Sequence, residues 1–437
     1  MSPALSTQPV RLGLAGFGTV GQGLASILAD SAEWIERRLG RPVVVTAMAV
    51  RDPSKVRPTP LPVGARFVAD PLELAAAEDV DIVVELMGGL NAAYDLIRLA
   101  LASGKHVVTA NKHLLAEKGE ELFALAAQKG VGLYYEASVC GGIPVVQTLK
   151  ESLAGNRIQT VTGILNGTSN FILSRMTRKG LSYADALKKA QKKGFAEADP
   201  TLDVEGFDAA HKLIVLIRLA YGQDYPLSAL PVTGITLVTP LDIAFAHEFG
   251  CEVKLIGQAK QVDGKIMAGV HPMLLSKSYL LAQVHGAFNA VRIVGDAVGA
   301  VMLYGQGAGG RPTGSAVLAD IMALARDGAA PNNTGFPEKV LPPAQMLPAE
   351  EETSRRYFRF TVEDKPGVLA ALAKALGDVG ISIYQAVQKV APDTQDESVV
   401  PIVFMTHHAR QRDVDAALEK IKAFPFVKAE PVHLRVL

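Results

Sequence analysis

The chain of 437 residues is too long for one hydrophobic core, and at roughly 150 residues per domain it predicts about three domains. Hydrophobic residues make up 49% of the chain and charged residues 20%, which excludes a disordered or fibrous protein. Basic and acidic residues are equal in number, 44 of each, and no dense basic run suggests a nucleic-acid or membrane partner. We therefore expect a protein that acts on a small molecule.

Three further features predict a soluble protein of the reducing cytoplasm. The two cysteines, Cys140 and Cys251, could form at most one disulfide and lie in no metal-binding pattern. The first ten residues lack the basic and apolar segments of a secretory signal peptide. No apolar run approaches the roughly 18 residues that a membrane-spanning helix needs.

The first third of the chain, from Val10 to about Glu136, alternates short apolar strands with helical stretches. The expected strands are VRLGLAG, VVVTAMAV, DIVVELMG, KHVVTAN and GLYYEAS. Such alternation predicts a parallel sheet built from βαβ units.

The middle of the chain has a different, α+β pattern. Amphipathic helices are expected over Tyr183–Lys193 and Asp208–Leu219. Strands are expected over Lys254–Gln261, Ile266–His271, Asn289–Val294 and Ala300–Gly305.

A change of composition separates the C-terminal part. Between Asp327 and Thr353, residues rich in Ala, Pro, Asn, Gly and Glu break both periodicities and predict a linker. From Arg355 the expected order is strand, helix, strand, strand, helix, strand. This βαββαβ order is the ferredoxin-like arrangement.

A glycine motif follows the first expected strand. Gly16, Gly18 and Gly21 form a GxGxxG pattern at the start of a helix, where they permit a tight turn, a close approach of backbone to a pyrophosphate and close helix packing. The helix N-terminus offers free N–H groups to the anion. Strand, motif and helix together predict a dinucleotide site.

The end of the second strand bears on the choice of dinucleotide. Arg51 stands where an acidic residue would bind a ribose hydroxyl, and an arginine there suits the 2′-phosphate of NADP. NADP is therefore favoured, with NAD possible. Two alternatives remain: Arg51 is a solvated loop residue, and Asp52 reaches the ribose.

An acid-rich segment precedes and opens the helix at Asp208. Asp208 and Lys212 are four residues apart and so share one helical face. They could form a simple surface ion pair. The apolar residues on both sides of Lys212 favour instead a partly buried lysine, with a pKa lowered toward the range useful for proton transfer.

Lys112 and a glycine-rich bend are further candidates. Lys112 follows the strand in VVTANKHLL, and the carboxyl ends of parallel strands line the ligand crevice, although a solvent-exposed lysine is an equal alternative.

The carbonyl oxygens of the bend YYEASVCGGIP could bind a hard cation. Cys140 in this bend has no neighbouring base, and His211 and His271 belong to no paired motif, so all three are interpreted as structural.

Six segments taken together resemble the homoserine dehydrogenase family. They are GFGTVGQG, TANK, YYEASVCGGIP, ILNGTSNFIL, GFAEADPTLDVEGFDAAHK and GQGAGGRPTGSAVLADI, in this order. The resemblance covers about Val10 to Asp327. The following segment VEDKPGVLAALAKALGDVGISI is similar to an ACT domain, a ferredoxin-like module that senses amino acids in related enzymes.

The resemblance implies reversible, NAD(P)H-dependent reduction of L-aspartate 4-semialdehyde to L-homoserine, in the biosynthesis of threonine, methionine and isoleucine. It implies that Lys212 is the catalytic acid/base with Lys112 assisting, and that Glu197 and Asp208 bind the substrate ammonium. Cofactor contacts are implied at Gly16, Phe17, Gly18, Thr19, Val20, Gly21, Arg51, Lys112, Gly194 and Gly309. A monovalent cation, sodium, is implied at Glu136, Val139, Gly141 and Ile143.

The expected fold class is α/β, with a Rossmann-type parallel sheet followed by α+β and ferredoxin-like parts. The nucleotide domain is assigned to residues 1–136, completed by a helix returning near 307–327. A catalytic and dimerisation domain covers 137–306, a linker 328–353 and an ACT domain 354–437. We expect a homodimer or homotetramer, with threonine as a candidate effector at the ACT domain.

Two other functions compete with this interpretation. Aspartate-semialdehyde dehydrogenase shares a substrate and a Rossmann half, but it needs a cysteine thiolate for covalent catalysis. A nucleotide-binding regulatory protein would sense amino acids without turnover. In such a protein, Lys212 and the acidic cluster would have no function.

Overall fold

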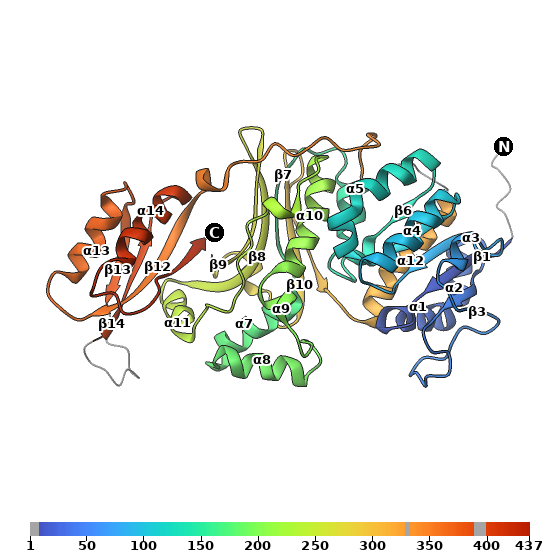
Figure 1. Ribbon diagram of the computed structural model, residues 1–437, viewed down its shortest axis with the longest axis horizontal. Coiled ribbons are helices and arrows are strands. Elements are labelled where there is room, and N and C mark those ends of the chain that lie inside the picture. Colours follow the sequence, from blue (N-terminus) through green and yellow to red (C-terminus); the bar gives the residue numbers. More distant parts are fainter. Residues whose placement is uncertain (1–7, 328–332, 389–398) are drawn as a thin grey trace. The chain divides into compact units, whose positions relative to one another are not determined.

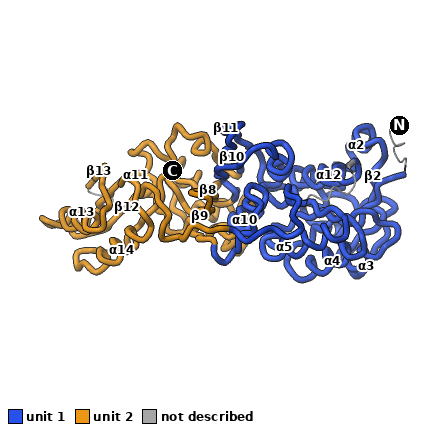
Figure 2. The backbone as a smooth tube through the Cα atoms, turned by 90° about the horizontal axis from the view of Figure 1, so that it is seen from above, with its two compact units in different colours: residues 1–167, 208–229, 288–344 blue, residues 168–207, 230–287, 345–437 orange. Residues whose placement is uncertain are grey.

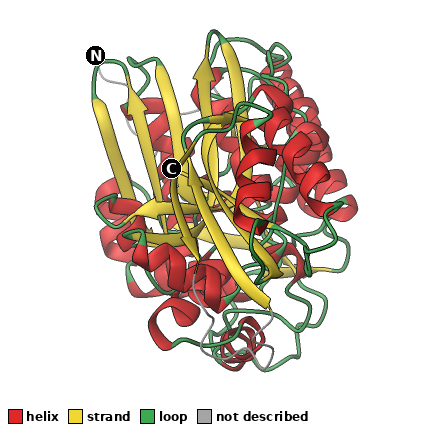
Figure 3. Cartoon of the chain, turned by 90° about the vertical axis from the view of Figure 1, so that its left-hand side faces the viewer, coloured by secondary structure: helices red, strands yellow, loops and turns green. Residues whose placement is uncertain are grey.

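The computed structural model describes residues 8–327, 333–388 and 399–437, which form two compact units of mixed helices and strands (Figures 2 and 3). Unit 1 comprises the chain up to Gly167 with 208–229 and 288–344, and unit 2 comprises 168–207, 230–287 and the chain from 345 onward. Among the described residues, no helix combines the length and apolar character needed to cross a bilayer.

Unit 1 is built on a six-stranded parallel sheet in the order β3-β2-β1-β4-β5-β6. Its strands are β1 (Val10–Ala15), β2 (Val43–Ala49), β3 (Arg66–Val68), β4 (Ile82–Glu85), β5 (His106–Thr109) and β6 (Leu133–Tyr134). This order is that of a doubly wound dinucleotide-binding sheet. Five strands were predicted. The sixth, β3, is three residues long and exposes two of them, so no apolar run indicates it.

Helices flank this sheet (Figure 1). They are α1 (Thr19–Asp30), α2 (Ala32–Leu39), α3 (Glu73–Ala76), α4 (Asn91–Ala102), α5 (Lys112–Lys129) and, much later in the chain, α12 (Gly310–Asp327). Leu24 of α1 and Ile321 of α12 share one buried cluster with Leu12 and Leu14 of β1. The sheet core is therefore completed by a distant part of the sequence.

The remaining elements of unit 1 include a second, antiparallel group of strands in the order β11-β10-β7. They are β7 (Ile158–Ile164), β10 (Phe288–Gly295) and β11 (Gly299–Gln306). The helices are η1 (Glu136–Ser138), α6 (Val145–Gln147), η2 (Thr148–Ser152), the long α10 (Phe207–Tyr221) and η3 (Leu227–Ala229). Nearly every side chain of α10 is buried, which explains its apolar sequence.

Unit 2 begins with helices and a long hairpin. The helices are α7 (Gly167–Lys179), α8 (Tyr183–Lys192), α9 (Thr201–Val204), α11 (Pro240–Glu248) and η4 (Leu280–Gln283). The hairpin pairs β8 (Cys251–Val262) with β9 (Lys265–Ser276). The predicted middle helices and strands are confirmed, and the two hairpin strands are longer than expected.

The C-terminal part of unit 2 has the predicted βαββαβ order. Its elements are η5 (Ala349–Glu351), β12 (Thr353–Glu363), α13 (Val368–Gly377), β13 (Ile383–Gln388), β14 (Val399–Thr406), the short β15 (Ala409–Arg410), α14 (Gln411–Lys422) and β16 (Val432–Val436). The sheet order is β16-β12-β14-β13, and β16 also pairs in parallel with β9. Residues 389–390 of the predicted second strand, 397–398 of the predicted third strand and 328–332 of the predicted linker lie outside the described residues.

Candidate functional site

The turn between β1 and α1 has the geometry that a dinucleotide pyrophosphate needs. Gly16 has φ +97°, and a Cβ there would lie 2.7 Å from the carbonyl oxygen of Leu86. At Gly21 a Cβ would lie 2.6 Å from the Gly16 carbonyl oxygen. A Cβ at Gly18 meets no atom within 4 Å, so a ligand can approach the backbone there. Gly16 and Gly21 thus have the tight-turn and close-packing roles expected from their spacing, and Gly18 leaves room for a ligand.

The first turn of α1 is open to an anion. Gly18 and Thr19 are exposed, while Phe17 is buried and Val20 half-buried. No side chain caps this end, and the first turn carries no acidic residue. The unpaired N–H groups and the helix dipole favour a phosphate here.

The helix α12 lies closely against α1. A Cβ at Gly23 would come within 2.0 Å of the Gly310 carbonyl oxygen, so only glycine permits this approach. Gly309 directly precedes α12 with φ +124°. Gly309 is one of the cofactor positions that the resemblance implies. It therefore lies in the same unit as the glycine turn.

Arg51 lies two residues beyond β2 and is exposed. Oδ1 of Asp52 accepts hydrogen bonds from the backbone N–H and hydroxyl of Ser54, at 2.9 and 2.6 Å. Arg57, which the sequence analysis missed, places its guanidinium carbon 5.9 Å from the centre of the Phe17 ring. The loop after β2 thus brings a second arginine to the nucleotide turn.

Asp208 is the centre of a buried charge cluster in unit 1. Its carboxylate accepts a hydrogen bond from Lys212 Nζ at 2.6 Å and lies 3.2 Å from Lys112 Nζ. Lys212 Nζ also donates to the Leu165 carbonyl oxygen at 2.7 Å. The predicted i, i+4 pair is present, and Lys112 joins it instead of pointing only to solvent. Asn166 Nδ2, which the sequence analysis did not single out, donates to Asp208 at 2.8 Å.

Burial and charge compete at Asp208. Asp208 and Lys212 are 9% and 8% exposed. Burial alone raises the pKa of the Asp208 carboxyl, but the charges of Lys212 and Lys112 outweigh burial and lower that pKa well below its usual value. Asp208 is therefore ionised at neutral pH. Two ammonium groups around one carboxylate leave the cluster with a net positive charge, which suits an oxygen that becomes negative during reaction.

Lys112 is held by the turn that precedes it. Asn111 caps α5 by accepting a hydrogen bond from the Leu114 N–H at 3.1 Å, and it donates to the Gly89 carbonyl oxygen at 2.7 Å. Thr109 donates to the fully buried Glu85 at 2.6 Å. The ends of β4 and β5 are thereby tied together, which fixes where Lys112 begins the helix.

Comparisons with known proteins show which family the chain is similar to. The family model "Homoserine dehydrogenase, NAD binding domain" matches residues 16–136, "Homoserine dehydrogenase" matches 144–322, and "ACT domain" matches 356–426. A homoserine dehydrogenase of Neisseria gonorrhoeae is 44% identical, over 98% of this chain and 99% of that protein.

The chain belongs to the homoserine dehydrogenase family. It is an oxidoreductase acting on a CH–OH group.

Solved homoserine dehydrogenases share the fold. A crystal structure of the enzyme from Thiobacillus denitrificans has a TM-score of 0.92 and 42% identity, covering 98% of both chains. A hyperthermophilic archaeal homoserine dehydrogenase in complex with NADPH has a TM-score of 0.61 and 29% identity, covering 72% of this chain and 97% of that one. The chain therefore shares the fold of solved homoserine dehydrogenases.

The bend that the resemblance assigns to sodium contains two consecutive left-handed residues, Cys140 at φ +57° and Gly141 at φ +52°. The Glu136 carboxylate accepts hydrogen bonds from the N–H groups of Val146 and Gln147, at 2.9 and 2.7 Å. Burial raises the pKa of Glu136 to about 7. The Glu136 backbone carbonyl oxygen also accepts a hydrogen bond, from the Val139 N–H at 3.3 Å.

Cys140 is buried, and burial raises the pKa of its thiol to about 11. A thiolate is therefore scarce at neutral pH. A homoserine dehydrogenase does not need one, whereas the competing semialdehyde dehydrogenase does.

Two of the implied site residues, Gly194 and Glu197, belong to unit 2. Gly194 follows α8 with φ +73°, and Glu197 is exposed, with its carbonyl oxygen accepting from Gln191 Nε2 at 3.2 Å. Their roles in a homoserine dehydrogenase stay predictions.

The two histidines interpreted as structural are both buried. His271 Nδ1 lies 3.2 Å from the Thr233 hydroxyl within unit 2. His211 of α10 stacks on His113 of α5, with ring centres 4.4 Å apart. Burial, and after it the neighbouring His113, lower the pKa of His211 to about 4. The sequence analysis missed His113, which lies next to Lys112.

Proposed function

We propose that Lys212 is the proton donor and acceptor in the interconversion of L-aspartate 4-semialdehyde and L-homoserine, with Lys112 assisting at the reacting oxygen. The observation that carries this proposal is the cluster of two lysines around the buried Asp208. Hydrogen bonds to Asp208 and to the Leu165 carbonyl orient the Lys212 ammonium before substrate binds. Such preorganisation lowers the cost of proton transfer.

The nicotinamide cofactor supplies the hydride in one direction and accepts it in the other. The chain's task is to neutralise the charge that develops on the substrate oxygen. The net positive cluster stabilises that charge, and Lys212 delivers the proton. Asp208 keeps the two ammonium groups together despite their repulsion, which explains why a carboxylate is buried there.

The glycine turn and the open N-terminus of α1 support a dinucleotide at this edge of the sheet. We propose NADP(H) as the favoured cofactor, with NAD(H) also used. Arg51 and Arg57 both lie in the loop after β2, and Arg57 lies over the Phe17 ring of the nucleotide turn. The NADPH complex of an archaeal relative adds support.

Arg51→Ala is expected to shift the cofactor preference toward NADH by roughly ten- to a hundredfold, because a charge-assisted hydrogen bond of about 1.5–3 kcal/mol to the 2′-phosphate is lost for NADPH alone. The measurement is kcat/KM for both cofactors in wild type and variant. Arg98→Ala, an exposed arginine on α4, is the matched control and should leave the ratio unchanged. A parallel fall for both cofactors would contradict a contact with the 2′-phosphate.

We propose that Glu197 and Asp208 bind the substrate ammonium. For Glu197, the support is its place in the segment GFAEADPTLDVEGFDAAHK, which resembles the family. Glu197→Gln is expected to lower kcat/KM for homoserine about ten- to a hundredfold, chiefly through KM, and to leave the Kd for NADPH unchanged. Asp199→Asn, in the same exposed loop, keeps an acceptor for the Thr201 N–H and serves as the control. Equal effects of the two substitutions would assign Glu197 to the loop rather than to the substrate.

Three further proposals rest on the family resemblance. The bend around Cys140 holds sodium through the backbone oxygens of Glu136, Val139, Gly141 and Ile143. Threonine binds the ACT-like part and inhibits, and the chain assembles as a homodimer or homotetramer. Titration of activity with NaCl against choline chloride, titration with threonine and light scattering measure these three properties.

A further inference from the structure

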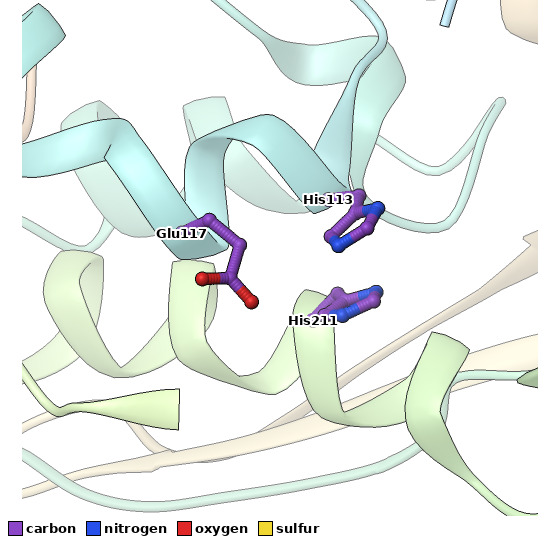
Figure 4. Close-up of side chains that lie close together, drawn as sticks. All are labelled: His113, Glu117 and His211. Atoms are coloured by element: carbon purple, nitrogen blue, oxygen red, sulfur yellow. The ribbon is translucent and has the colours of Figure 1, made fainter. Parts of the chain in front are cut away.

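The side chains of two histidines and a glutamate lie close together beside the lysine cluster. The proposed reaction uses none of these three residues. His113 and Glu117 are four residues apart on α5, so they share one face of that helix. His211 faces them from α10. Figure 4 shows both imidazole rings and the Glu117 carboxylate directed toward the same space between the two helices.

The separations suit a single metal ion. One ligand atom from each residue can be chosen so that all three lie within 4.8 Å of one another. A point then exists within about 2.8 Å of all three atoms, since the largest separation divided by √3 bounds that distance. Zinc bonds to imidazole nitrogen and carboxylate oxygen are about 2.0–2.2 Å long. Inward movement of less than about 1 Å by each side chain is enough to form them.

The movement required is a rotation of side chains. The stacked rings of His113 and His211 have an interplanar angle of 16°, so their in-plane lone pairs lie in two nearly parallel planes and do not meet at one point. Rotation about the bond that joins each ring to its Cβ makes them converge, and this torsion has a broad energy minimum. Glu117 is exposed and His113 half-buried, so an ion can reach these two ligands from solvent, whereas His211 is buried.

We propose that His113, Glu117 and His211 form a binding site for Zn²⁺ that clamps α5 to α10. Two imidazoles and one carboxylate are a donor set that suits zinc, whereas magnesium and calcium prefer oxygen ligands alone. Three protein ligands leave a fourth position for water. The clamp joins the helix that begins with Lys112 to the helix that carries Asp208 and Lys212. Metal occupancy thereby holds the two lysine-bearing helices together.

Zinc binding to the full chain, freed of metal by a chelator, tests the proposal without reference to catalysis. Isothermal titration with ZnCl₂ is expected to show one site per chain, and MgCl₂ no binding. Loss of a residue that only supports a metal ligand typically lowers metal affinity about 10- to 100-fold. His113→Ala and Glu117→Gln alter ligands themselves. Each should therefore weaken zinc binding by about a hundredfold or more. Saturating Zn²⁺ should raise the thermal unfolding midpoint of the wild type but not of these variants.

Matched substitutions separate this site from unspecific binding. Glu120→Gln changes an exposed glutamate of the same helix, and His408→Ala removes an exposed histidine of the ACT-like part. Both should keep wild-type zinc affinity. Co²⁺ should give the visible spectrum of a four-coordinate site in the wild type and lose it in Glu117→Gln, an exposed change that the fold tolerates. Unchanged zinc affinity in the His113 and Glu117 variants, or equal loss in the controls, would overturn the site even if every catalytic assignment held.

Discussion

Lys212→Ala is expected to lower kcat by about 10²- to 10⁴-fold, the range that a positioned proton donor contributes. NADPH should bind nearly as before, because the glycine turn and the loop after β2 make no use of Lys212. Steady-state kinetics with homoserine, together with fluorescence titration of NADPH, measure the two quantities separately. The size of the effect follows from the geometry, since Lys212 Nζ is fixed by Asp208 and by the Leu165 carbonyl.

Lys212→Arg separates charge from proton transfer. An arginine keeps a cation beside Asp208, but its guanidinium does not release a proton at neutral pH. Activity should therefore remain low even where the fold is intact. Lys129→Ala, an exposed lysine at the end of α5, is the control for loss of a lysine in unit 1. Retention of more than about a tenth of kcat in Lys212→Ala would exclude the role as proton donor.

Asp242→Asn is expected to destabilise unit 2 by about 3–5 kcal/mol, the usual cost of removing one partner of a buried ion pair. Asp242 is fully buried. It accepts from Arg359 Nε at 2.6 Å and from the Tyr357 hydroxyl at 3.0 Å, both on β12. It also caps α11 by accepting from the Thr239 hydroxyl and N–H, at 2.6 and 3.0 Å. One carboxylate thus joins the part matching the ACT model to the helix before the β8–β9 hairpin.

Urea unfolding, followed by near-ultraviolet circular dichroism, measures this destabilisation. Asp263→Asn is the control, because Asp263 is exposed at the hairpin turn with φ +49°, a conformation that asparagine adopts readily. In the double variant Asp242→Asn with Arg359→Met, much of the lost stability should return, since no charge is left buried without its partner. A double variant less stable than the Asp242→Asn protein would contradict a cost that arises from the unpaired Arg359.

Local spacing was enough to predict the nucleotide turn. Gly16, Gly18 and Gly21 act through the backbone conformation of one turn, so their roles follow from positions along the chain. The pairing of Asp208 with Lys212 was predictable for a similar reason, because residues four apart in a helix share a face.

Contacts between distant segments escaped prediction. Asn166 reaches Asp208 from the segment after β7, and Arg57 reaches Phe17 from the loop after β2. Neither has a spacing that the helix or strand period relates to its partner. The site of His113, Glu117 and His211 shows both cases, since His113 and Glu117 are a visible i, i+4 pair and His211 arrives from another helix.

By itself, the sequence determined five of the six strands of the nucleotide sheet, the glycine turn and the helical face of Asp208 and Lys212, because each depends on the pattern of a short segment. Only the tertiary structure decided that Lys112 joins Asp208 and that Leu165 offers its carbonyl oxygen to Lys212. The physical reason is that these contacts arise from how apolar faces far apart in the chain pack into one core. Packing of that kind depends on the shapes of many side chains together, which no local pattern contains.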